Sequence, residues 1–352
     1  MLVEGKGEYR TVWMQGNSVW MIDQLLLPFS FELLEAPTFL DTRRTIKEMN
    51  IRGAGAIGAT AGYGMAQGFI EGEPDEAKKA LDSARPTAKN LTYATDRVYE
   101  AAIGTGSPVA TALKEAQDIA DEDSDGCFKI GKYGAELIYQ KSRELGRRVN
   151  MLTHCNAGWL AFVDWGSALS PVYVAKRNET PVHVYADETR PRSQGARLTA
   201  WELRNEGVSH QVIPDTAVAI MMERGMIDLV IVGADRIAAN GDTANKLGTQ
   251  SVARNARHYG VDFYFAAPLS TIDRDCPNGE VIEIEQRDED EVLYMQGLTD
   301  DNEVTRVRVI SPDSPAYNPA SFDVTKAVDV TGLITPKGII KPNPATIAGL
   351  FR

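Results

Sequence analysis

The spacing of apolar residues changes once along the chain, near residues 144 to 149. Before that point, residues 9–14 and 18–22 are β-prone runs on either side of Gln15-Gly16-Asn17, which predicts a hairpin. Apolar residues then recur at helical spacing between breaks made by Gly, Pro or acidic clusters. We expect helices at residues 41–49, 56–69, 74–83, 91–102 and 129–145.

Beyond Arg147, short apolar runs alternate with helical patterns. This order is typical of a doubly wound parallel sheet, so the fold class is α/β. We therefore predict two domains, an N-terminal β-hairpin and helical domain (1–147) and a Rossmann-like domain (148–352). The acidic run 283–291 and residues 297–302 are expected to be solvated connections. Strands are predicted at 149–153, 182–186, 211–213, 229–232 and 263–266, and helices at 196–203, 216–224 and 246–258.

The run 229–232 is aliphatic throughout, which favours a strand buried on both faces. Asp235 follows it, at the sheet edge where α/β proteins bind ligands, and a dry setting there would raise its pKa. We expect Asp242 or Thr243 to cap a following helix with Asn245 and Lys246 in its first turn. A lysine is unfavourable at that end of a helix, which suggests a bound anion such as phosphate. An Asp after a strand is also a common turn or capping residue.

Two further predicted strand ends carry polar groups. Cys155, in Thr153-His154-Cys155-Asn156, is placed for activation by a helix N-terminus, although free cysteines are more often inert and buried. Adjacent strand residues point to opposite faces, so His154 and Cys155 are not expected to form a dyad. The charged run 187–197 suits a phosphorylated ligand, or else surface ion pairs.

Gly53-Ala54-Gly55-Ala56-Ile57-Gly58 has the glycine spacing of a dinucleotide site. The residues before it look helical, whereas that motif must follow a strand, so a nicotinamide or flavin site is disfavoured. Alternatively, Arg52 and the small residues after it form a turn whose N–H groups receive a phosphate. Close helix packing with a salt-bridged Arg52 is the structural alternative.

Composition narrows the class of protein. The chain has 43% hydrophobic and 24% charged residues, values typical of a globular protein. Its net charge of −12 argues against nucleic-acid and anionic-membrane partners. No signal peptide or membrane span is evident, so a cytoplasmic location is expected. Three widely spaced cysteines indicate neither a disulfide framework nor a metal cluster.

Taken together, these motifs resemble those of the methylthioribose-1-phosphate isomerases, whose superfamily includes ribose-1,5-bisphosphate isomerases and regulatory subunits of a translation-initiation exchange factor. The resemblance implies Cys155 and Asp235 as the catalytic pair. It also implies a sugar phosphate substrate, no cofactor or metal, and a homodimer. The residues implied to hold the substrate are Arg52, Gly53, Ala54, Arg85, Gln194, Asn245 and Lys246. The similarity runs through Arg52-Gly53-Ala54, Arg85-Pro86-Thr87, residues 153–158, 187–191 and 194–203, Gly233-Ala234-Asp235-Arg236, Asn245-Lys246, residues 267–273 and Tyr317-Asn318-Pro319.

The implied reaction converts 5-methylthioribose 1-phosphate to 5-methylthioribulose 1-phosphate in methionine salvage. Since the C1 phosphate locks the sugar ring, Asp235 would first protonate the ring oxygen. Cys155 would then take the C2 proton as a thiolate, or stabilise the charge that develops if a hydride moves directly from C2 to C1.

Three positions depart from the family pattern. Gly55 stands where the family usually has Pro, Ser321 interrupts the late motif, and Lys326 replaces a usual Pro. Alternative substrates are therefore 5-deoxyribose 1-phosphate and ribose 1,5-bisphosphate. A non-catalytic regulatory subunit is the alternative from another class.

Overall fold

The computed structural model describes residues 1–85 and 88–352. Pro86 and Thr87, which complete the motif that begins at Arg85, lie outside the described residues.

The N-terminal part begins with the predicted hairpin. Strands β3 (Val12–Gln15) and β4 (Ser18–Ile22) pair antiparallel, with Trp13 opposite Trp20. A third strand, β5 (Leu33–Ala36), pairs with β4 and was not predicted from the sequence. Two shorter strands, β1 (Leu2–Val3) and β2 (Gly7–Glu8), pair with each other near the N-terminus.

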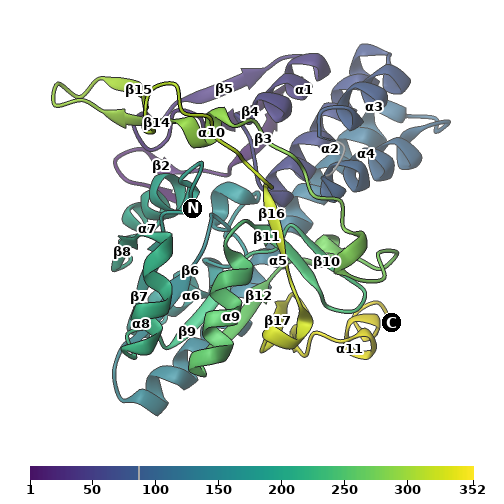
Figure 1. The fold of residues 1–352 in the computed structure, drawn as a ribbon. Coiled ribbons are helices and arrows are strands. Elements are labelled where there is room, and N and C mark those ends of the chain that lie inside the picture. Colours follow the sequence, from purple (N-terminus) through teal and green to yellow (C-terminus); the bar gives the residue numbers. More distant parts are fainter. Residues whose placement is uncertain (86–87) are drawn as a thin grey trace.

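Five helices follow the hairpin, and α2 lies at their centre (Figure 1). Helix α2 (Ala54–Glu71) is buried along most of its length, because its glycines and alanines let neighbouring elements pack closely around it. It packs in one core with the β3–β4 hairpin and with α1 (Phe39–Glu48), α3 (Pro74–Asp82), α4 (Lys89–Ala102) and the start of α5 (Pro108–Leu145).

Helix α5 starts well before the predicted residue 129. The acidic cluster at 118–125 was interpreted as the end of a helical pattern. However, Ala112, Ala116 and Ile119 recur at helical spacing and are buried. The first half of α5 packs in the N-terminal core. Ile130 and Ile138, in its second half, pack with Val149 beneath the large sheet. The helix therefore connects the two cores.

The C-terminal part contains the expected parallel sheet. Its strand order is β18-β17-β12-β9-β6-β7-β8, and β18 alone is antiparallel among these described strands. The parallel strands thus follow the order of a Rossmann fold, which confirms the predicted fold class. They are β6 (Val149–Thr153), β7 (Val182–Asp187), β8 (His210–Ile213), β9 (Leu229–Val232), β12 (Asp262–Ala266) and β17 (Gly332–Thr335), with β18 (Gly338–Ile340) at the edge.

Helices cover both faces of this sheet (Figure 1). Leu229 and Ile231 of β9 pack in the core that includes α5 and α6 (Ser170–Arg177). Val230 and Val232 pack on the opposite side with α8 (Val218–Glu223) and α9 (Thr249–Tyr259). A π-helical turn (Gly195–Thr199) leads into α7 (Ala200–Asn205) after β7. Strand β9 is therefore buried on both faces, as its sequence predicted.

The predicted helix start at residues 242–246 is wrong. Thr243–Lys246 is a strand, β11, which forms a hairpin with β10 (Arg236–Ala238), and α9 begins only at Thr249. Asn240-Gly241 makes the turn, with φ 90° at Gly241, and Asn-Gly between two short runs is a hairpin signal that the prediction overlooked. Strands β13 (Ile272–Asp273) and β16 (Phe322–Thr325) complete this second sheet.

The acidic segment leads into a hairpin that projects from the body of the protein (Figure 1). Its strands are β14 (Tyr294–Leu298) and β15 (Val304–Arg308), preceded by α10 (Asp290–Leu293). Helix α11 (Pro344–Gly349) lies near the C-terminus. Short 3₁₀ turns occur at Trp159–Ala161, Asp215–Ala217, Leu269–Thr271, Gly279–Val281 and Ala327–Asp329. Among the described helices, none is long and apolar enough to cross a bilayer.

Candidate active site

The main cavity lies where the strand order of the large sheet reverses. Strands β6 and β9 are neighbours although β7 and β8 intervene in sequence, and ligands of α/β sheets bind at such points. Cys155 follows β6 and Asp235 follows β9, and both line this cavity. All nine residues singled out from the sequence line this cavity: Arg52, Gly53, Ala54, Arg85, Cys155, Gln194, Asp235, Asn245 and Lys246.

The backbone around Cys155 is fixed from two sides. Its φ is 67°, and its N–H donates to Oγ1 of Thr189 at 2.8 Å. Its carbonyl accepts a hydrogen bond from the Thr199 hydroxyl at 2.7 Å. Burial raises the pKa of the thiol, while the charges of Arg52 and Lys246 oppose that rise. Binding of a substrate anion to those cations would alter this balance.

Asp235 follows β9, the strand on the other side of the switch point from β6. Its backbone N–H donates to the Ala244 carbonyl at 2.9 Å, which ties the end of β9 to the hairpin carrying Lys246. Burial raises the pKa of Asp235 to about 6, although Arg85, Lys246 and Arg52 each oppose the rise. A carboxyl group with this pKa is protonated often enough near neutral pH to act as an acid.

Cations from both parts of the chain surround the cavity. Arg52 and Arg85 come from the N-terminal part, whereas Lys246 comes from β11. Burial lowers the pKa of Lys246, which is 5% exposed, and within the described chain its ammonium has no ion-pair or hydrogen-bond partner. A buried and unpaired ammonium is costly unless a ligand anion compensates it. Lys246 is therefore the clearest indication of a phosphate site.

Helix α2 adds polar backbone groups to the same place. Gly53 precedes the helix with φ 96°, and a Cβ there would lie 2.3 Å from the Cα of Ala161. Only glycine fits this approach, which brings the first turn of α2 to the cavity. The N–H groups of a first helical turn have no partners within the helix and bind anions well.

Arg52 is held in place by a buried chain of contacts. Its guanidinium donates to the Asn156 backbone and side-chain oxygens and to Oε1 of Gln24 at 3.2 Å. Asn156 in turn donates to Glu202 at 2.8 Å. Glu202 is fully buried and also accepts hydrogen bonds from the Trp159 and Leu160 N–H groups and the Tyr173 hydroxyl. Glu202 thus positions the loop that follows Cys155, a role that its sequence context did not reveal.

The side chain of His154 is engaged away from Cys155. Its Nδ1 lies 2.9 Å from the Asp187 carboxylate, and its Nε2 lies 2.9 Å from the Leu247 carbonyl. Both ring nitrogens therefore have partners, in keeping with the expectation that His154 and Cys155 do not form a dyad. The contact with Leu247 joins the end of β6 to the residue after Lys246.

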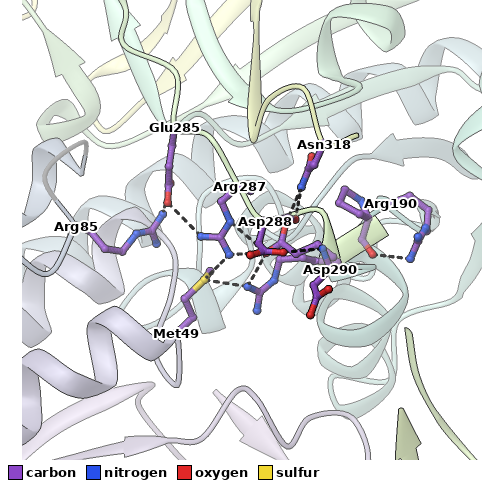
Figure 2. Close-up of polar contacts among 11 residues, drawn as sticks. Met49, Arg85, Arg190, Glu285, Arg287, Asp288, Asp290 and Asn318 are labelled. Atoms are coloured by element: carbon purple, nitrogen blue, oxygen red, sulfur yellow. Dashed lines mark hydrogen bonds and ion pairs between the residues drawn. The ribbon is translucent and has the colours of Figure 1, made fainter. Parts of the chain in front are cut away.

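The acidic segment 283–291 was wrongly expected to be a solvated connection. Glu285 and Arg287 line the main cavity, and Figure 2 shows Glu285 reaching both Arg85 and Arg287. These two ion pairs measure 2.9 and 3.1 Å. Arg287 also pairs with Glu291, and its guanidinium donates to the Met49 sulfur at 3.0 Å. The alternation of acids with one arginine gave no periodic signal by which the sequence could have revealed this role.

The motif residue Asn318 supports the same segment. Its amide donates to the Asp288 carbonyl at 3.1 Å (Figure 2). The Arg190 guanidinium donates to the Val292 carbonyl at 3.1 Å. Tertiary contacts thus hold the segment over the cavity.

The side chains around Gly55 and Lys326 show how these two departures from the family pattern fit this structure. A Cβ on Gly55 would lie 2.3 Å from Oδ1 of Asp123 and 2.5 Å from Cδ1 of Phe162, so these side chains occupy the space that a larger residue would need. Gly55 does not line the main cavity. Lys326 forms an ion pair with Asp242 at 3.1 Å.

Ser321, the third departure, does line the cavity. It is 3% exposed, and its hydroxyl has no hydrogen-bond partner among the described residues. Its backbone joins two parts of the site, because its N–H donates to Glu285 and its carbonyl accepts from the Leu247 N–H. The structure gives no reason for serine rather than another small residue here.

One group of described side chains has the composition of a metal site. Ligand atoms of His154, Asp187 and Asp215 lie within 4.8 Å of one another. The His154 nitrogens are engaged, however, and the Asp215 oxygens accept the backbone N–H groups of Thr189 and Arg190 at 2.7 Å each. These contacts favour a structural role in shaping the loop after β7.

Comparison with known proteins places the chain in a family. Residues 52–342 match the model of the initiation factor 2 subunit family. The chain is 46% identical to a methylthioribose-1-phosphate isomerase of Methylorubrum populi, an alignment that covers 100% of this chain and 98% of the relative. The crystal structure of 5-methylthioribose 1-phosphate isomerase from Pyrococcus horikoshii OT3 has a TM-score of 0.85 at 39% identity, covering 98% of this chain and 96% of that chain. A structure from A. fulgidus, described as subunit delta of the translation initiation factor eIF-2B, has a TM-score of 0.79 at 36% identity, covering 97% of this chain and 100% of that chain. The chain belongs to the initiation factor 2 subunit family and, within it, to the methylthioribose-1-phosphate isomerases.

Proposed function

We propose that this protein converts 5-methylthioribose 1-phosphate to 5-methylthioribulose 1-phosphate, a step of methionine salvage. The observation that carries the proposal is that Cys155 and Asp235 line one cavity at the switch point of the sheet. Lys246, whose ammonium has no partner among the described residues, lines the same cavity. A regulatory subunit would need neither a buried acid with a raised pKa nor a thiol beside it.

The first chemical step opens the sugar ring. Protonated Asp235 donates its proton to the ring oxygen as the bond from that oxygen to C1 breaks. The positive charge that develops at C1 makes the hydrogen on C2 acidic. The resulting Asp235 carboxylate lies among Arg85, Lys246 and Arg52, whose charges stabilise it.

The second step moves one proton between the two carbons. The Cys155 thiolate takes the proton from C2, and a double bond forms between C1 and C2. The Asp235 carboxylate then accepts the proton of the C2 hydroxyl, while the Cys155 thiol returns its proton to C1. The product is the ketose 1-phosphate, and both side chains recover their starting protonation states.

The charge pattern favours a substrate with one phosphate. Lys246, Arg52 and the first turn of α2 are proposed to hold the C1 phosphate, with Gln194 and Asn245 placed to contact the sugar. A second phosphate would need further cations, yet Arg192 is paired with Glu291 at 3.2 Å. Arg190 and Arg197, which belong to the charged run 187–197, donate to backbone carbonyls.

Steady-state kinetics on three compounds tests the proposal. We expect the highest kcat/KM on 5-methylthioribose 1-phosphate and measurable turnover of 5-deoxyribose 1-phosphate, because a small apolar group changes specificity only about ten- to two-hundredfold. Ribose 1,5-bisphosphate is expected to be a poor substrate. A higher kcat/KM on the bisphosphate would refute the proposed substrate, and absence of turnover on all three would refute the enzymatic function.

The pH dependence distinguishes the two roles of Cys155. With Asp235 at a pKa of about 6 and the thiol pKa raised above its ordinary value, the reactive pair needs protonated Asp235 and the Cys155 thiolate. Each rise of one pH unit above about 6 lowers the first fraction tenfold and raises the second tenfold. We therefore expect kcat/KM to be flat from about pH 7 to 9, as these two changes cancel. A tenfold fall per pH unit over this range would indicate a neutral thiol and the direct hydride route.

We also propose that the protein acts in the cytoplasm, as its sequence led us to expect, and that it is a homodimer, as the family resemblance implies. Light scattering coupled to gel filtration tests the dimer, and a mass equal to one chain would contradict it.

A further inference from the structure

A second cavity adjoins the main one on the side away from Cys155. It shares Gly53, Ala54, Arg85, Asp235 and Phe322 with the main cavity. Cys155 and Lys246 line only the main cavity. Asp235 therefore lies at the boundary between the two spaces.

Eight of the fourteen residues that line this side cavity are apolar, and Asn90 and Glu283 are among the polar ones. Ile57 is 3% exposed and Ile282 is 7% exposed, and Ile284 is half-buried. Ala88 and Ala244 contribute smaller apolar surfaces. Trp159 and Leu160, which follow Cys155 in the sequence, line neither cavity, because both are fully buried in the core beneath the large sheet.

The cations at the rim of the side cavity already have partners. Lys89 and Arg236 lie 4.0 and 3.6 Å from the Asp273 carboxylate. Arg85 pairs with Glu285. This side cavity thus suits an apolar group better than a second phosphate.

The chemistry of Asp235 orients the sugar between the two cavities. This step rests on the proposed function, in which Asp235 protonates the ring oxygen. That oxygen joins C1 to C4, and C5 is attached to C4. With C1, C2 and the phosphate beside Cys155 and Lys246, the C5 substituent extends past Asp235 toward the side cavity.

We propose that the side cavity binds the methylthio group on C5, and that Ile57, Ile282 and Ile284 determine the preference for this group over smaller or charged C5 substituents. Glu285 follows Ile282 and Ile284 in the same segment and lines the main cavity. One segment therefore contributes both to the proposed site for the C5 group and to the cavity that contains Cys155.

The test compares kcat/KM on 5-methylthioribose 1-phosphate with kcat/KM on 5-deoxyribose 1-phosphate. Ile282→Ala and Ile284→Ala should each lower this ratio about fivefold or more, because the methylthio group loses apolar contact. Turnover of the 5-deoxy compound should change less than about threefold. Ile284→Ala is expected to fold normally even if Ile282→Ala does not, because Ile284 is only half-buried.

Val281→Ala is the matched control. Val281 precedes Ile282 in the same segment but is 59% exposed and does not line the side cavity. It should leave the ratio unchanged. An unchanged ratio in both isoleucine variants of an active enzyme, or an equal shift in Val281→Ala, would overturn this inference alone. If the unmodified protein converts neither compound, the proposed function fails and the assignment of the side cavity fails with it.

Discussion

Asp235→Asn and Cys155→Ser are each expected to reduce kcat at least about a hundredfold, the usual scale for acid and base groups. Asparagine keeps the shape of Asp235 but has no proton to give to the ring oxygen. Serine keeps the size of Cys155 approximately, but a hydroxyl is a far weaker acid than a thiol and cannot supply an anion near neutral pH. Steady-state kinetics on 5-methylthioribose 1-phosphate measures both effects.

We expect the Asp235→Asn and Cys155→Ser variants to keep the fold of the unmodified protein. Circular dichroism and thermal unfolding are expected to match the unmodified protein, because both side chains face the cavity. Cys276→Ser is the control for Cys155→Ser, since Cys276 is 7% exposed and lies outside the main cavity. It should retain normal turnover. Near-normal turnover in Cys155→Ser or Asp235→Asn would remove that residue from the mechanism.

Glu202→Ala is expected to lower the free energy of unfolding by about 3 to 5 kcal/mol, a loss typical of breaking a buried polar network. Glu202 accepts hydrogen bonds from Asn156, Trp159, Leu160 and Tyr173, at 2.7 to 3.2 Å. Alanine would leave these donors buried and unsatisfied, and each such group costs about 1 to 3 kcal/mol before the structure relaxes. Urea unfolding measures the difference.

The same variant should also weaken substrate binding, because Asn156 holds Arg52. Under conditions where the variant stays folded, we expect KM to rise more than kcat falls. Glu136→Ala is the control, since Glu136 is an exposed glutamate of α5, and it should change stability by less than about 0.5 kcal/mol. A loss below about 1 kcal/mol in Glu202→Ala would show that the network is not essential to the fold.

Local pattern was enough to predict most of the regular elements. The aliphatic run of β9 and the helical spacing in α2 reflect burial that neighbouring residues share, so a short window contains the signal. The local pattern was misleading in two places. An acidic cluster concealed the first half of α5, and a strong turn was overlooked between β10 and β11.

Some of the site residues could be predicted from the sequence and others could not. Cys155 and Asp235 could be chosen from the sequence because each follows a predicted strand, and carboxyl ends of parallel strands share one edge. Glu202, Glu285 and Arg287 carried no such signal. Each of them has a contact with a residue that is distant in sequence. Glu202 contacts Asn156 at 46 positions, Glu285 contacts Arg85 at 200 and Arg287 contacts Met49 at 238.

The fold class, the strand ends that carry Cys155 and Asp235, and the family motifs can all be read from the sequence. Three features become visible only in the folded chain: β6 and β9 are neighbours, Lys246 lies on a strand without a partner among the described residues, and an acidic segment lines the cavity. Backbone periodicity depends on local burial, whereas strand order, charge pairing and cavity shape depend on how distant segments pack. The apolar side cavity beside Asp235 belongs to the second group, because α2, the β10–β11 hairpin and residues 282–284 form it only when they meet.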